Sequence, residues 1–177
     1  MTLYFDLDGV LRDLGPMVIG HDPISWNEKV NNKDFFQLVE EDKTVLYKAP
    51  PTQYLSVVLA LCDEINILSS QLSGNWCEFT DIWIDNHIRR YKHVNVKYVS
   101  KPAEKIAFLK NDDILIEDYP FFVDYSKIVV VDHPYNRILS KAEKQPITRI
   151  SNTDEMKDFL LSSPLTQKTQ SGIIRSI

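Results

Sequence analysis

The sequence predicts an α/β fold in which helices cover both faces of a parallel sheet and a helical segment is inserted after the first strand. Short apolar or β-branched runs recur along the chain and end at polar or turn residues, as buried strands do. Amphipathic helical patterns separate most of these runs, which is typical of a three-layer parallel sheet. The chain has 177 residues, of which 44% are hydrophobic and 25% charged, and this fits one compact domain with a small insertion.

Five runs are expected to form the strands. They are Leu3–Phe5, Ile65–Leu68, Val94–Val99, Ile114–Ile116 and Ile128–Val131. In open parallel sheets, ligands bind beyond the carboxyl ends of the strands. Polar side chains that follow these runs are therefore the candidates for a functional site.

Four segments have apolar residues at helical spacing, at 52–62, 76–91, 103–109 and 153–161. Pro50-Pro51-Thr52 is a typical start for the first of them. Asn152 or Thr153 can cap the last. These segments supply the helices that the predicted sheet needs.

Residues 14–49 interrupt the alternation and are too many for a strand–helix connection, which usually takes a few residues. We expect a small helical insertion here, over the functional site, and a core domain made of 1–13 and 50–162. The aromatics Trp26, Phe35 and Phe36 either contact a substrate or form the core of the insertion itself. Residues 163–177, rich in Ser, Thr, Gln and Lys, are expected to be a loosely ordered tail.

The net charge of −5 argues against a protein that binds nucleic-acid polymers, since these need a basic face. It allows a small phosphorylated ligand, because a bound cation can supply positive charge locally. No secretory leader is expected from the first residues, and no apolar stretch of about 18 residues occurs in the sequence. The cytosol is the expected compartment, with no membrane partner.

A DxDG motif at residues 6–9 follows the first predicted strand directly. Alternate residues of an extended chain point the same way, so Asp6 and Asp8 are expected to leave the strand end together. Two neighbouring carboxylates repel unless a cation lies between them, and Mg²⁺ prefers carboxylate, water and phosphate oxygens. Gly9 permits a sharp turn. The alternative is that the motif is only an acidic turn.

Hydroxyl groups and lysines follow at two further places. Ser69 and Ser70 come after the second strand, where a hydroxyl can donate to a phosphoryl oxygen. Lys105 precedes the fourth strand, with Lys101 and Lys110 nearby, and a lysine that reaches a transferring phosphoryl group would neutralise its charge. Either feature alone is ordinary in a loop or on a surface, and Lys101 remains an alternative to Lys105.

An acidic pair, Glu117 and Asp118, follows the fourth strand and could complete a metal site begun by Asp6 and Asp8. The four features, in this order at strand ends, resemble the haloacid dehalogenase (HAD) superfamily of phosphohydrolases over roughly residues 3–131. The resemblance implies an open, Rossmann-like sheet with a helical cap and a bound Mg²⁺. It also implies that Asp6 is the nucleophile, forming an aspartyl-phosphate, and that Asp8 is the general acid and base.

The same resemblance implies the remaining roles. The metal ligands would be Asp6, the backbone carbonyl of Asp8, and Asp118, with Glu117 supporting them. The phosphoryl oxygens would be bound by the side chains of Ser69, Ser70 and Lys105. A carboxylate nucleophile divides a difficult displacement into two easier steps, which agrees with these roles.

Three segments resemble the 5′-nucleotidase and 5′(3′)-deoxyribonucleotidase branch of that superfamily: residues 6–13, 115–118 and 134–137. This implies a (deoxy)nucleoside monophosphate substrate, with the aromatics of the insertion stacking on the base. The sequence departs from that branch at Leu14, at residues 69–73 and at Glu117. Another small phosphate ester, such as a sugar phosphate, is the alternative substrate; a catalytically silent phosphate-binding protein and a phosphatase of nucleic-acid ends are further alternatives.

Overall fold

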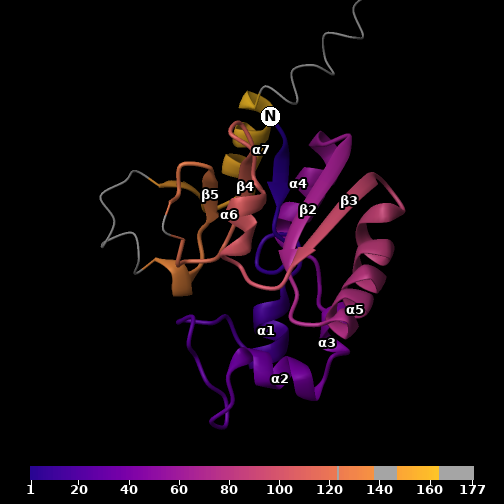
Figure 1. Ribbon diagram of the computed structural model, residues 1–177, viewed down its shortest axis with the longest axis vertical. Helices are drawn as coiled ribbons and strands as arrows, with labels where there is room; N and C mark the ends of the chain where they lie inside the picture. The colour runs from indigo at the N-terminus through magenta and orange to yellow at the C-terminus, as the bar shows by residue number, and fades with distance from the viewer. Residues whose placement is uncertain (123, 138–146, 164–177) are drawn as a thin grey trace, which may run out of the picture.

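Six parallel strands form a single sheet in the order β3-β2-β1-β4-β5-β6 (Figure 1). The computed structural model describes residues 1–122, 124–137 and 147–163, so the expected tail lies outside the described residues except for Ser163. The strands are β1 (Leu3–Phe5), β2 (Glu64–Ser70), β3 (His93–Val99), β4 (Ile114–Glu117), β5 (Ile128–Val131) and β6 (Thr148–Ile150). The predicted α/β class with a parallel sheet is confirmed. β6 was not expected, because a three-residue strand with two polar residues has no apolar run.

The strand β1 lies at the centre and sets the position of the functional site. It pairs in parallel with β2 on one side and β4 on the other, with Phe5 in register with Ile67 and Ile116. The pairing continues one residue further, since the amide of Asp6 donates to the carbonyl of Ile116 at 2.8 Å. The residues that follow β1 and β4 therefore emerge side by side at one edge of the sheet.

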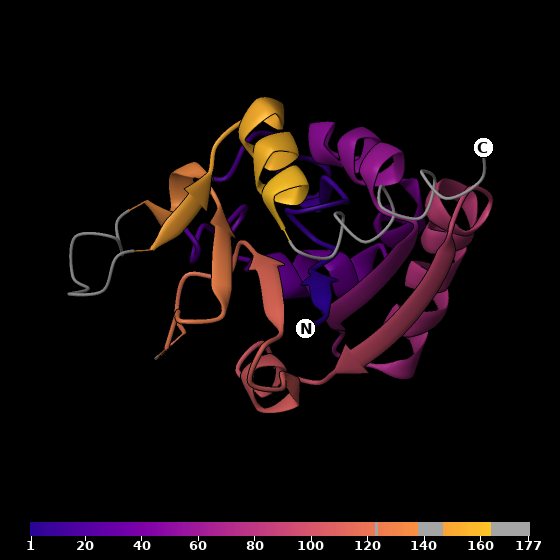
Figure 2. The same ribbon diagram turned by 90° about the horizontal axis from the view of Figure 1, so that it is seen from above.

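One face of the sheet is covered by α4 (Gln53–Leu61), by α5 (Gly74–Ile84), which the π-helix η1 (Asp85–Arg89) continues, and by α7 (Thr153–Ser162). Figure 2 shows α4 and α7 side by side on this face. Thr52, Ser73 and Asn152 accept a hydrogen bond from the first turn of their helices, as good caps do. These helices and the strands share a buried apolar core that includes Phe5, Ile67, Val58, Trp83 and Met156.

The opposite face has a thinner cover. It consists of the short helix α6 (Glu104–Phe108) and the segment after β4, which pack Leu109, Phe122 and Tyr125 against Leu115 and Val130. None of the described helices is long and apolar enough to cross a membrane.

Residues 14–49 contain three short helices, α1 (Leu14–Ile19), α2 (Phe35–Glu41) and α3 (Val45–Lys48). They lie beyond the ends of the strands toward which the arrows point (Figure 1). Their small core includes Leu14, Val39 and Leu46, and it packs against Trp76 of α5. The insertion therefore rests on the core domain at the edge where the functional site is expected.

Candidate functional site

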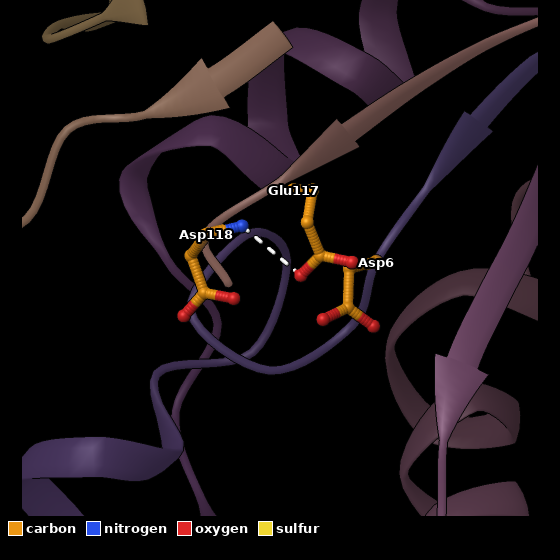
Figure 3. Close-up of side chains that lie close together, drawn as sticks. All are labelled: Asp6, Glu117 and Asp118. Atoms are coloured by element: carbon orange, nitrogen blue, oxygen red, sulfur yellow. Dashed lines mark hydrogen bonds between the residues drawn. The ribbon is translucent and has the colours of Figure 1, made fainter. Parts of the chain in front are cut away.

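Three carboxylates gather where β1 and β4 end (Figure 3). They belong to Asp6, Glu117 and Asp118, and one oxygen of each lies within 4.8 Å of the others. All three residues are buried, with relative exposures of 6%, 0% and 6%. The Asp118 amide donates to Glu117 Oε1 at 3.1 Å, which fixes the turn that presents both acids. We call these three residues the acidic cluster.

The buried side chain of Lys105 lies against this cluster. Its Nζ is 2.8 Å from Asp6 Oδ1 and 2.6 Å from Glu117 Oε2. Burial disfavours the charged ammonium group, but the negative charges of Asp6 and Glu117 raise the pKa of Lys105 above its usual value. Of the two lysines considered for this role, Lys105 reaches the cluster, whereas Lys101 is exposed.

One lysine does not balance three buried carboxylates. Burial, followed by repulsion from Glu117, raises the pKa of Asp6 well above its usual value although Lys105 opposes the shift. Burial, followed by the charge of Asp6, raises the pKa of Asp118 to about 7. Asp6 Oδ1 is buried and accepts no hydrogen bond of good geometry from the described residues. Its contact with Lys105 Nζ is an ion pair.

This donor set fits a divalent metal ion. The potential ligands are all oxygens, as a hard cation such as Mg²⁺ requires, and a second positive charge would relieve the repulsion among the carboxylates. Glu117 was expected only to support the metal ligands, but its carboxylate lies beside those of Asp6 and Asp118 within the acidic cluster. The cluster can therefore hold a metal ion.

Asp8 is placed differently from Asp6, although both leave the same strand end. Its carboxylate pairs with Arg12, whose Nε is 2.6 Å from Oδ1 and whose Nη2 is 2.9 Å from Oδ2. The sequence argument had not singled out Arg12. The available signal was its position four residues after Asp8 within the motif segment.

The two serines after β2 face different surroundings. Ser70 lines the pocket described below, whereas Ser69 is buried and accepts a hydrogen bond from Gln71 Nε2 at 3.0 Å. The strand runs two residues beyond its predicted end, so successive side chains at 69 and 70 point to opposite faces. Of the two serines, Ser70 is the one that lines the pocket.

The segment after β5 closes one side of the acidic cluster. The Tyr135 hydroxyl donates a short hydrogen bond to Asp118 Oδ2, and the His133 ring stacks on Tyr135 at 5.0 Å between centroids. His133 Nε2 is 2.7 Å from the carbonyl of Gly9, and Asn136 Nδ2 donates to the Asp118 carbonyl at 3.0 Å. This segment therefore holds the DxDG turn and Asp118 together.

Gly9 has φ +76°, and the space around it is tight. A Cβ atom there would lie 2.1 Å from Asp118 Oδ2 and 2.9 Å from the Tyr135 hydroxyl. The glycine is required both by its backbone conformation and by this close approach.

A pocket of about 180 Å³ opens from the acidic cluster toward the insertion. Its charged wall includes Asp6, Asp8, Lys105 and Glu117. The wall that the insertion contributes includes the three aromatics singled out in the sequence, Trp26, Phe35 and Phe36.

These aromatics also touch other rings. Trp26 lies 5.2 Å from Tyr119 and 5.7 Å from Tyr135, and Phe36 lies 6.3 Å from Trp76 of α5. Phe35 packs against the core of the insertion. The three aromatics therefore both line the pocket and pack against neighbouring side chains.

Chemically, the acidic cluster beside Lys105 can bind a metal ion and an anionic group at the mouth of one pocket. No protein-family model matches the chain, and no curated protein matches its sequence. The site is therefore described by its geometry: a buried group of three acids and one lysine at the carboxyl edge of a parallel α/β sheet.

Proposed function

We propose that this chain is a magnesium-dependent phosphatase in which the Asp6 carboxylate is the nucleophile. The observation that carries the proposal is the contact of 2.8 Å between Lys105 Nζ and Asp6 Oδ1 within the acidic cluster. It places a carboxylate, a fixed positive charge and oxygen ligands for a metal at one end of a pocket. The resemblance of the DxDG segment to HAD phosphohydrolases supports the same assignment.

Asp6, Glu117 and Asp118 would hold the ion, which when bound supplies positive charge to the oxygens of the phosphoryl group. Asp6 attacks phosphorus, the bond from phosphorus to the substrate oxygen breaks, and an aspartyl-phosphate forms. Water then attacks the phosphorus of this acyl phosphate, which releases inorganic phosphate and restores Asp6. Lys105 stabilises charge on the phosphoryl oxygens in both steps.

Asp8 is assigned the proton transfers. It gives a proton to the departing alkoxide in the first step and accepts one from the attacking water in the second. Its carboxylate lines the pocket beside Asp6, so it can reach a group bound there. Ser70, which also lines the pocket, is placed to donate to a phosphoryl oxygen.

The proposed substrate is a (deoxy)nucleoside 5′-monophosphate. The phosphate would lie at the acidic cluster and the base against Trp26, Phe35 and Phe36, since base–aromatic stacking contributes about 1–3 kcal/mol per base in single-strand binders. A sugar phosphate is the alternative. It would need hydrogen-bonding groups in place of an aromatic wall.

A phosphate-release assay tests the proposal. Nucleoside and deoxynucleoside 5′- and 3′-monophosphates, sugar phosphates and p-nitrophenyl phosphate would be compared with Mg²⁺ and with excess chelator. The expected result is Mg²⁺-dependent release with the highest kcat/KM for a nucleoside 5′-monophosphate. A preference for sugar phosphates would support the alternative substrate, and no release from any ester would indicate a silent phosphate-binding protein.

A further inference from the structure

Arg12 is the charged group that the assignment above leaves unused. Its side chain is wholly buried, which is rare for arginine. Two of its nitrogens meet both oxygens of Asp8, at 2.6 and 2.9 Å, in the parallel arrangement that gives arginine–carboxylate pairs their strength and direction. Its guanidinium also lies 5.8 Å from the centre of the Trp83 ring.

The third nitrogen of Arg12 binds other parts of the molecule. Nη1 donates to the carbonyl of Leu46 in α3 at 2.5 Å and to Thr80 Oγ1 in α5 at 3.2 Å. Thr80 Oγ1 donates in turn to Gln71 Oε1 at 3.2 Å, and Gln71 Nε2 lies 3.4 Å from Asp8 Oδ2. These hydrogen bonds form a closed ring through four side chains, those of Asp8, Arg12, Thr80 and Gln71.

The two acids of the DxDG motif are therefore held by two different buried cations. Asp6 is paired with Lys105 inside the acidic cluster, and Asp8 is paired with Arg12 outside it. The side chain of Asp8 remains 27% exposed and lines the pocket. Arg12 thus fixes the orientation of the Asp8 carboxylate, and the carboxylate still stays accessible to a molecule bound in the pocket.

We infer that Arg12 is a positioning residue for Asp8. It holds the Asp8 carboxylate at the pocket wall, directed away from the acidic cluster and toward the leaving oxygen of the substrate. Because Arg12 also donates to the Leu46 carbonyl, the orientation of Asp8 depends on the position of the insertion. This inference rests on the proposed function, because it assumes that Asp8 transfers the proton. Lysine cannot replace Arg12, since a single ammonium group does not make two parallel bonds to one carboxylate.

The dependence of rate on the leaving group separates positioning from a merely structural role. A nucleoside 5′-monophosphate expels an alkoxide, which needs a proton in the transition state, whereas p-nitrophenyl phosphate expels a phenolate that leaves without one. In single-turnover measurements we expect Arg12→Lys to slow release of the nucleoside at least about tenfold, as part of the 10²–10⁴-fold that general acid–base catalysis contributes. Release of p-nitrophenol in the same measurement, and KM for the nucleotide, should each change less than about threefold, since neither depends on that proton. The single-turnover measurement isolates the first step, because the second step, in which Asp8 is the base, is the same for both esters.

Thr80→Val provides a second, nearly isosteric variant that removes the hydroxyl between Arg12 and Gln71. It should show the same selectivity for the nucleotide with a smaller loss. Arg89→Lys, at an exposed arginine paired with Asp85, is the matched control and should leave both rates unchanged. In an Asp8→Asn background, Arg12→Lys should have little further effect on the nucleotide, because Arg12 acts through Asp8.

Each outcome decides between the two claims. Equal losses in the first-step rate on both esters from folded Arg12→Lys protein, or additive losses in the Asp8→Asn background, would overturn the positioning role and leave the phosphatase assignment intact. A wild-type protein that hydrolyses neither ester would overturn both. Nucleotide-selective loss in Arg12→Lys and Thr80→Val, absent in Arg89→Lys, would support the inference.

Discussion

The two walls of the pocket are built in different ways. The wall at the sheet edge carries buried charged groups whose positions follow from strand register, since Asp6 and Glu117 lie at the ends of the paired strands β1 and β4. The wall from the insertion carries aromatics on short helices and a loop, and Phe36 there is 41% exposed. The comparison indicates that the sheet fixes the positions of the charged groups, whereas the aromatic wall belongs to a segment that can change without disturbing the sheet.

The largest effect is expected at the sheet edge. Asp6→Asn should lower phosphate release by at least about 10³-fold, because an amide is not a competent nucleophile. Released phosphate is measured for the purified, folded variant, with Asp63→Asn as a control at an exposed aspartate. Retention of more than a few per cent of the activity would end the aspartyl-phosphate assignment.

Removal of the metal should have the next largest effect. Excess chelator should abolish activity, Mg²⁺ should restore it, and Ca²⁺ should inhibit, since Ca²⁺ is larger and prefers six to eight ligands in a flexible geometry. Activity is titrated against each ion. Full activity in chelator would show that the acidic cluster is not a catalytic metal site.

Changes in the insertion should act on the nucleotide alone. Trp26→Ala, Phe35→Ala and Phe36→Ala are each expected to lower kcat/KM for a nucleoside monophosphate about 5- to 100-fold, as loss of a stacking contact would. The same variants should leave p-nitrophenyl phosphate much less affected, because binding energy remote from the phosphate is absent from that ester.

Tyr91→Ala, at an exposed aromatic outside the pocket, is the control for these variants. Equal losses on both esters in folded protein would mean that the three aromatics only hold the insertion together. The two walls would then not divide chemistry from recognition.

A separate effect concerns stability and pH, measured on unfolding instead of activity. The pKa of Asp118 is raised from 3.8 to about 7 by burial and by Asp6, so between these values the folded protein keeps a proton that the unfolded chain has released. Asp118 therefore favours folding at low pH, and this contribution is lost as the pH rises through 7. In chelator we expect the free energy of unfolding to fall between about pH 4 and pH 8, by roughly 1.4 kcal/mol for each unit of pKa difference at most.

Mg²⁺ should oppose that decline because it takes the place of the proton. Its stabilising effect in denaturant titrations should be larger at pH 8 than at pH 5. Asp118→Asn should be more stable than the wild type in chelator at pH 8 and should lose most of the response to Mg²⁺. A response of equal size at both pH values would contradict the proposed coupling between Asp118 and the metal.

The predicted fold was confirmed where burial leaves a local signal. Apolar runs such as Ile114–Ile116 indicate the central strands. The rule that ligand sites lie beyond strand ends predicted that Asp6 and Asp118 lie close together, as they do. The edge strand β6 was missed because Thr148 and Arg149 are polar. Its identity depends on pairing with β5, which no local pattern records.

The partners within the site were harder to predict. Arginine is seldom buried, so the position of Arg12 four residues after Asp8 does not by itself indicate that its side chain is enclosed and paired with that carboxylate. The contact of Tyr135 with Asp118 joins segments whose approach depends on the packing of the whole edge. Residue types that carry chemistry are visible in the sequence, whereas the groups that orient them are decided by tertiary contacts.

The central position of β1 has a consequence for how the protein is made. Its neighbour β4 lies more than a hundred residues later in the chain, as the bond from the Thr2 amide to Asp113 illustrates. A ribosome adding about 5–20 residues per second needs on the order of ten seconds to supply that partner. During this interval the apolar strand that leads into Asp6 has only part of its final sheet, so the Asp6 carboxylate reaches Lys105 and its acidic neighbours late in synthesis.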